Sequence, residues 1–245
     1  MKFSIICVYN NKKILEKYLL SSLKKQTEKY QLVLLDNTKN RFKSAAEALN
    51  YGAKKAKGKY LMFVHQDVEL QGKDWLKKAE NSLSAISDLG IAGVAGMSEC
   101  GEDNLKRGRN IIWHGNPPAK WSWGNKIDKP ERVQTLDECL LTIPKSVFKL
   151  YQFDEKTCHD WHLYGADYCL SIRQKNLYAY VIPIEILHFS VGKNFSKHYY
   201  KTLKKILKKH KKNVNRIYTT MGDWNTNTPL YLKKTIHNLK LFLKK

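Results

Sequence analysis

Short apolar runs alternate with longer amphipathic stretches along the first 100 residues. The apolar runs are five or six residues long and predict buried strands over 3–8, 31–35, 60–64 and 91–96. Between them, apolar residues recur at helical spacing and predict helices over 14–23, 44–57 and 72–87. Alternation of strands and helices predicts an α/β fold, with a mostly parallel sheet flanked by helices on both faces.

The pattern is less regular beyond residue 97. A polar and aromatic connection reaches about residue 132 and contains Trp121 and Trp123. Connections this long are usually functional or disordered, so these tryptophans either face a ligand or anchor the loop to the core. Strand character returns over 133–143, 178–182 and 186–189, and a helix is expected over 163–176.

Polar side chains follow three of the predicted strands directly. Tyr9 and Asn10 end the first strand, Asp36 ends the second, and His65-Gln66-Asp67 ends the third. Open α/β sheets bind ligands at the carboxyl ends of their strands. A carboxylate there suits Mg²⁺ or Mn²⁺, which prefer oxygen ligands and also bind substrate phosphates. Taken alone, Asp67 is better explained as the cap of the next helix or turn.

Composition restricts the class of protein. With 245 residues and 42% apolar content, the chain can form one large domain, or one domain with an appendage. Five cysteines without a C-x-x-C pair argue against a disulfide framework and a structural zinc site. Without an apolar run of about 20 residues or a signal peptide, we expect a cytoplasmic protein.

The net charge of +22 is concentrated near the C-terminus. Residues 196–245 contain 14 Lys and Arg against a single acid, Asp223. A helix is expected from Ser196 with apolar residues on one face and lysines on the other, followed by a second helix over 228–243. This tail either docks on an anionic membrane surface or packs on the domain with its lysines solvated. We therefore divide the chain into a domain over 1–195 and a basic helical extension over 196–245.

Six motifs occur in a fixed order along the chain. They are Val8-Tyr9-Asn10, Asp36, Asn50-Tyr51-Gly52, Val64-His65-Gln66-Asp67, the segment Ala166-Asp167 with Leu170 and Arg173, and His188. This order resembles the family 2 glycosyltransferases of the GT-A fold over about residues 3–192. The stretch 161–167 is similar to a branch of bacterial polysaccharide and rhamnosyl-type transferases.

The resemblance implies an inverting glycosyltransferase of polysaccharide biosynthesis. It would move a sugar from a UDP, GDP or dTDP donor to a hydroxyl of a glycan or lipid-linked acceptor. Asp167 matches the catalytic base, while Asp67 and His188 match the ligands of a Mn²⁺ or Mg²⁺ ion. Residues that match the nucleotide-sugar site are Tyr9, Asn10, Asp36, Asn50, His65 and Gln66. Trp121, Trp123 and His162 are candidate acceptor contacts, although each also has a purely structural explanation.

The implied chemistry has a physical basis. The cation would neutralise the charge that develops on the diphosphate leaving group. A base would take the proton of the attacking hydroxyl, and Asp167 near a helix N-terminus would be ionised for that role. Two positions depart from the family pattern. His65 replaces the first acid of D-x-D, and Ala166 replaces the Glu of the E-D pair.

Two other classes explain part of the sequence. The basic charge is compatible with a nucleic-acid-binding protein, but no recognised binding motif accompanies the lysines. A nucleotidyltransferase of related sheet topology is the other alternative, but its Gly-rich phosphate loop is missing. The sequence also lacks the glycine patterns of dinucleotide-binding and P-loop folds. Attachment to the inner face of the membrane would require the basic tail.

Overall fold

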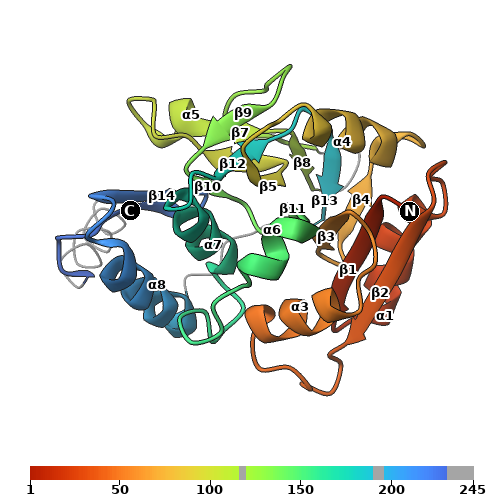
Figure 1. The fold of residues 1–245 in the computed structure, drawn as a ribbon, viewed down its shortest axis with the longest axis horizontal. Helices are drawn as coiled ribbons and strands as arrows, with labels where there is room; N and C mark the ends of the chain where they lie inside the picture. Colours follow the sequence, from red (N-terminus) through yellow and green to blue (C-terminus); the bar gives the residue numbers. More distant parts are fainter. Residues whose placement is uncertain (116–119, 190–195, 231–245) are drawn as a thin grey trace.

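The computed structural model describes residues 1–115, 120–189 and 196–230 (Figure 1). Its centre is a seven-stranded sheet with the order β2-β1-β3-β11-β5-β12-β9. The strands are β1 (Phe3–Tyr9), β2 (Tyr30–Asp36), β3 (Tyr60–Val64), β5 (Leu89–Gly93), β9 (Glu131–Val133), β11 (Leu140–Pro144) and β12 (Tyr178–Val181). Helices cover the sheet, which confirms the expected α/β class.

The N-terminal half follows the hydrophobic pattern closely. Strand β1 pairs in parallel with β2 and with β3, and all five residues of β3 are buried. The first predicted helix is a continuous run of α1 (Lys12–Leu15), a π-helical turn η1 (Glu16–Leu20) and α2 (Ser21–Leu23). The next two are α3 (Ala45–Lys54) and α4 (Trp75–Ser84). Local periodicity therefore predicted these elements within a few residues of their observed ends.

The middle of the sheet differs from a simple parallel order. Strand β11 inserts between β3 and β5 and is antiparallel to both. The predicted strand over 91–96 is divided into β5 and β6 (Ala95–Met97), and β6 joins a small sheet with β7 (Gly108–Asn110) and β10 (Thr135–Leu136). The predicted strand over 133–143 is also divided, into β9, β10 and β11. These breaks arise because the chain changes partners between sheets, which continuous apolar runs do not reveal.

A second small sheet brings distant segments to the end of β3. It contains β4 (Val68–Leu70), β13 (Ile186–His188) and β8 (Ile112–His114) in the order β4-β13-β8. His188 lies opposite Val68 on one side and His114 on the other. The turn between β3 and β4 therefore lies next to the last residue of β13. The short helix α5 (Asn104–Arg107) precedes β7 within the long connection.

The C-terminal segment packs against the same core. Helices α6 (Lys145–Leu150) and α7 (Tyr164–Arg173) precede α8 (Lys197–His210), which lies beside α7 in Figure 1 and is followed by the hairpin of β14 (Arg216–Thr219) and β15 (Gly222–Asn225). The apolar face of α8, with Tyr199, Leu203 and Ile206, is buried in the cluster that covers the sheet. Of the two expectations for this helix, packing on the domain is the one observed.

Two predictions about the C-terminal tail are not tested by the structure. The helix predicted over 228–243 lies outside the described residues from residue 231 onward. The domain boundary at residue 195 stays a prediction, and across it α8 shares its hydrophobic cluster with α7 and the sheet. No helix in the described ranges combines the length and the apolar character that a membrane span requires.

Candidate active site

A cavity of about 360 Å³ opens at the carboxyl ends of β1 and β3. This volume lies within the range of small-molecule sites, about 300–1,000 Å³. Residues from several distant segments line it: Val8, Tyr9, Asn10, Asn37, Asn40, Ala45, Leu49, Phe63, Val64, His65, Gln66, Asp67, Trp161 and Tyr164. The cavity therefore lies where the ends of the predicted strands converge.

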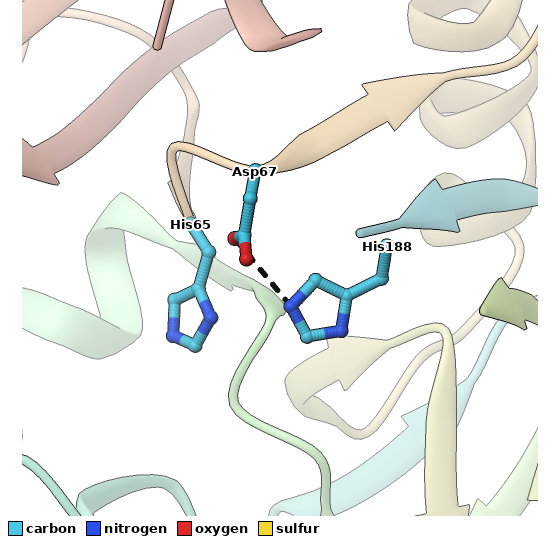
Figure 2. A group of neighbouring side chains, drawn as sticks. All are labelled: His65, Asp67 and His188. Carbon is cyan, nitrogen blue, oxygen red and sulfur yellow. Dashed lines mark ion pairs between the residues drawn. The ribbon is translucent and has the colours of Figure 1, made fainter. Parts of the chain in front are cut away.

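Three side chains at one end of this region form a compact group (Figure 2). His65 and Asp67 come from the turn between β3 and β4, and His188 comes from the end of β13. One ligand atom from each lies within 4.8 Å of the other two, and Asp67 Oδ1 is 3.5 Å from His188 Nε2. Their backbones are also joined, because Phe189 N donates to the Asp67 carbonyl over 3.1 Å.

The chemistry of this group fits a divalent cation. Nδ1 of the buried His188 lacks a hydrogen-bond partner among the described residues, and its Nε2 faces Asp67 Oδ1 over 3.5 Å. Burial lowers the pKa of His65, so its ring is neutral and can offer a lone pair. Removal from water would raise the pKa of the Asp67 carboxyl, but its contact with His188 and the nearby ring of His65 hold that pKa below the ordinary value. Two imidazoles and one carboxylate suit Mn²⁺ or a similar ion.

The nucleotide-site candidates from the first three strand ends lie together. Gln66 Oε1 accepts from the backbone N–H groups of Asn10 and Asn11 over 3.1 and 3.0 Å. The Gln66 amide also donates to Asn10 Oδ1 over 2.7 Å, which joins the end of β1 to the turn after β3. Asp36 is exposed beside this group and accepts from the Tyr9 hydroxyl over 3.0 Å. Tyr9, Asn10, His65 and Gln66 all line the cavity.

Asn50 does not belong to this group. Its side chain is 4% exposed and donates to the Phe153 carbonyl and to Glu155, while it accepts from Phe153 N over 3.1 Å. The amide thereby satisfies the backbone of a loop 103 residues away. Asn50 thus joins α3 to the segment before α7 and does not line the cavity, and the nucleotide contact expected for it stays a prediction.

Asp167 also lies away from the cavity. Its side chain is 2% exposed, accepts from Lys209 Nζ over 2.7 Å and lies 2.8 Å from His210 Nε2. Both partners are on α8. The structure therefore does not bring Asp167 to Asp67 and His188, and the three residues do not share one cleft. The catalytic-base assignment has no support from this geometry, because both carboxylate oxygens are engaged inside the protein.

The acceptor candidates have different surroundings. Trp121 is 44% exposed and stacks on His114, whose ring centroid is 4.5 Å away and which itself lies 5.7 Å from the ring of His188. Trp123 is half-buried, packs against the core, and its carbonyl accepts from Asn110 over 2.9 Å, so it anchors the loop. His162 contacts the Tyr199 ring edge-on, with ring centroids 5.8 Å apart, and burial lowers its pKa. None of the three lines the cavity described above.

The sequence interpretation missed Asp137 and Glu138 as residues of this region. Cys139, the next residue along the chain, accepts from His65 N over 2.9 Å, which places this segment beside the third strand end. Removal from water would raise the pKa of Asp137, but the nearby rings of His188 and His65 and hydrogen bonds from Cys139 hold it below its ordinary value. Two acids before a fully apolar run were a usable signal. It was hidden because 133–143 was read as a single strand.

Comparisons with solved structures support the fold. GalNAc-T7, crystallised with UDP, GalNAc and Mn²⁺, has a TM-score of 0.60 at 15% identity, over 84% of this chain and 47% of its own. The mannosyltransferase PcManGT from Pyrobaculum calidifontis, in complex with GDP-Man and Mn²⁺, has a TM-score of 0.57 at 12% identity, over 87% of this chain and 65% of its own. S. aureus TarS 1-349 in complex with UDP-GlcNAc has a TM-score of 0.53 at 16% identity, over 84% of this chain and 66% of its own.

Sequence comparisons extend this result. A protein of Fuscovulum blasticum named ATP synthase subunits region ORF 6 is 31% identical over 141 residues, which cover 55% of this chain and 53% of that protein. The chain thus spans about half the length of this relative and of GalNAc-T7. The profile of a family described as glycosyltransferase-like matches residues 4–210.

The mixed sheet has the GT-A type of fold that these similar structures share. The family profile covers most of the chain, and the protein belongs to this glycosyltransferase-like family. Both the expected fold class and the resemblance to glycosyltransferases are therefore confirmed.

Proposed function

We propose that the protein transfers a sugar from a nucleotide-diphosphate sugar to a hydroxyl group of a glycan or a lipid-linked acceptor. The observation that carries this proposal is that His65 and Asp67, which form one group with His188, line a cavity that is also lined by Tyr9 at the end of β1 and by Asn37 just after β2. UDP or GDP sugars are the preferred candidates for the donor, because the similar structures contain UDP, UDP-GlcNAc or GDP-Man.

His65, Asp67 and His188 would hold the divalent cation, with Mn²⁺ the first ion to test. The bound cation supplies positive charge where the diphosphate leaving group becomes more negative. The chain contributes the orientation of the ligands, since β4 and β13 fix Asp67 and His188 by pairing their strands. Asp137 adds negative charge to this group from the neighbouring segment.

An inverting single displacement is the reaction course that the cavity favours. Among the described residues that line it, Asp67 is the only carboxylate, and it faces His188 (Figure 2). A double displacement would need a second carboxylate as nucleophile within reach of the sugar. The anomeric configuration of the product, determined by NMR, tests this part of the proposal directly.

The experiment that tests the function measures nucleotide binding by isothermal titration calorimetry. UDP, GDP and dTDP are titrated into the protein with and without Mn²⁺, and we expect one of them to bind in a Mn²⁺-dependent manner. Asp67→Ala should lose that binding, since it removes the only anionic ligand of the group. Asp128→Ala is the matched control, because Asp128 is exposed and does not line the cavity.

Two outcomes would contradict the proposal. Unchanged Mn²⁺-dependent binding by Asp67→Ala would remove the metal site from these residues. Stabilisation of the wild-type protein by oligonucleotides, with no response to any nucleotide diphosphate, would favour the nucleic-acid alternative. Incubation with a panel of sugar nucleotides and mass spectrometry of the products would then identify donor and acceptor.

A further inference from the structure

Trp161 is the large aromatic side chain on the wall of the candidate donor cavity. Its side chain is 38% exposed, although Trp75 and Trp224 in the same molecule are buried. It shares the cavity with His65 and Asp67, and Tyr164 lines the wall beside it. A partly exposed indole in the wall of a cavity offers a flat surface with a negative centre and suits a ligand with polarised C–H groups. The C–H face of a sugar ring has this character.

The segment that carries Trp161 is held by an unusual helix start. Leu163 adopts a left-handed backbone conformation with φ of 66°, and α7 begins immediately after it without a cap from the N-terminal residue's own side chain. The first N–H groups of a helix need acceptors when they are withdrawn from water. The acceptors here come from a different part of the chain.

Glu138 supplies the hydrogen-bond acceptors for two N–H groups at the start of α7. Its Oε2 accepts from Leu163 N over 3.0 Å and its Oε1 accepts from Gly165 N over 2.7 Å. The Tyr164 hydroxyl donates to the Glu138 carbonyl over 3.3 Å. Contact is close, because a Cβ at Gly165 would lie 3.1 Å from Glu138 Cγ.

The same segment also fixes the cation group. Cys139, next to Glu138, accepts from His65 N over 2.9 Å. Three consecutive residues, Asp137 to Cys139, therefore connect the His65 turn with the Trp161 wall. The transferred sugar is covalently attached to the diphosphate, so it must lie close to the cation group when the donor is bound. Among the aromatic residues that line the cavity, Trp161 is an exposed one, whereas Phe63 and Tyr164 are buried.

We propose that the sugar ring of the donor stacks on Trp161, and that Glu138 is the positioning residue that holds Trp161 and Tyr164 in place for it. This inference rests on the proposed function and adds the subsite that recognises the sugar. Glu138 acts through the backbone of α7 and does not itself contact the donor.

Calorimetry with a nucleotide and its sugar conjugate separates this subsite from nucleotide binding. The pairs are UDP with UDP-GlcNAc and GDP with GDP-Man, each with Mn²⁺. For the pair that the wild-type protein binds, Trp161→Ala should leave the affinity for the nucleotide unchanged. It should lower the affinity for the sugar nucleotide by about tenfold, as expected for a lost aromatic contact. Trp161→Phe should restore most of it. Leu150→Ala, which removes a side chain that is 74% exposed, is the control.

Glu138→Gln tests the positioning role with a nearly isosteric side chain. An amide can accept only one of the two N–H groups, so the exchange of the Leu163 and Gly165 amide protons should become faster. The affinity for the sugar nucleotide should fall, as in Trp161→Ala, while the affinity for the nucleotide should again be unchanged. Glu102→Gln, at an exposed position, should change neither quantity.

The outcomes are distinct. If Trp161→Ala binds nucleotide and sugar nucleotide as the wild-type protein does, the stacking subsite is wrong while the proposed function stands. If Glu138→Gln exchanges its amides faster but keeps the sugar affinity, the positioning role is wrong. A wild-type protein that binds neither nucleotides nor sugar nucleotides overturns the inference together with the proposed function.

Discussion

The two aspartates singled out by the motif order have opposite surroundings. Asp67 is 24% exposed at the cavity and faces two imidazoles, whereas Asp167 is 2% exposed and is enclosed by Lys209 and His210. A buried carboxylate is tolerated when it is paired and hydrogen-bonded. The geometry of Asp167 therefore matches an anchor for α8, and Lys209 extends the anchor by contacting Asp154 over 2.9 Å.

Asp167→Asn should destabilise the fold. The substitution removes the negative charge that pairs with Lys209. Loss of one member of a buried ion pair costs about 3–5 kcal/mol. Urea denaturation monitored by tryptophan fluorescence measures the change. Asp160→Asn, which affects a pair with the exposed His198, should cost much less. A variant with wild-type stability that has lost sugar transfer would instead restore Asp167 as the catalytic base.

The stability of the protein should depend on pH through Glu138. Removal from water raises the pKa of this carboxyl to about 8, from an ordinary value of 4.5, against the effect of its two N–H donors. A carboxyl with a raised pKa in the folded state binds its proton more tightly there than in the unfolded chain. The contribution of the protonated Glu138 to the free energy of unfolding is therefore complete below pH 4.5. It is lost as the pH rises to about 8.

Chemical denaturation between pH 5 and 9 tests this expectation. The free energy of unfolding of the wild-type protein should fall over this interval more steeply than that of Glu138→Gln, which cannot titrate. Parallel profiles of the two proteins would show that Glu138 is ionised throughout.

At the scale of elements, pairing between distant strands builds the site. Strand β13 brings His188 to the turn after β3, and the pairing of β8 with β13 adds His114 behind it. Packing of helix α8 likewise determines the surroundings of Asp167 on α7. The buried face of α8, which includes Leu203 and Ile206, covers the side of the domain on which Asp167 lies.

Ile206→Ala should lower the free energy of unfolding by about 2–5 kcal/mol, because truncation of a fully buried aliphatic side chain leaves a cavity. Ile206 is 1% exposed. Lys204→Ala on the exposed face of the same helix is the control and should change the stability by less than about 0.5 kcal/mol. Equal effects of the two substitutions in urea denaturation would show that α8 is not packed on the domain in solution.

At the scale of the whole molecule, the charge is distributed unevenly. With its apolar face buried, α8 cannot insert into a bilayer by that face, but Lys201, Lys204 and Lys208 remain exposed on the other. We propose that this face attracts an anionic membrane surface electrostatically, which would bring the enzyme to lipid-linked acceptors. Each lysine near such a surface contributes about 1 kcal/mol.

Substitution of Lys201, Lys204 and Lys208 by Glu should weaken binding to phosphatidylserine vesicles by at least about 100-fold. High salt should weaken binding of the wild-type protein as well, because the attraction is screened. Vesicle sedimentation measures both effects. Replacement of the exposed Lys13, Lys24 and Lys25 by Glu changes the net charge equally and should have a smaller effect. Equal losses in the two variants would assign the attraction to net charge alone.

The linear pattern was sufficient for the elements whose burial is set locally. Strands β1, β2 and β3 and helices α3 and α4 follow from their periodicity, and polar residues at the ends of β1 and β3 line one cavity. These features depend on neighbours a few positions apart in the chain, where side-chain direction follows directly from the repeat of the helix or strand.

The surroundings of individual side chains depended on contacts that cross the whole chain. Asn50 is bonded to Phe153, Asp167 to the end of α8, and Glu138 to the start of α7. No periodicity relates such pairs, since their meeting depends on how β11 and α8 are inserted and packed. A motif therefore located the candidate acids, whereas burial and long-range pairing separated Asp67, the candidate cation ligand, from the enclosed Asp167.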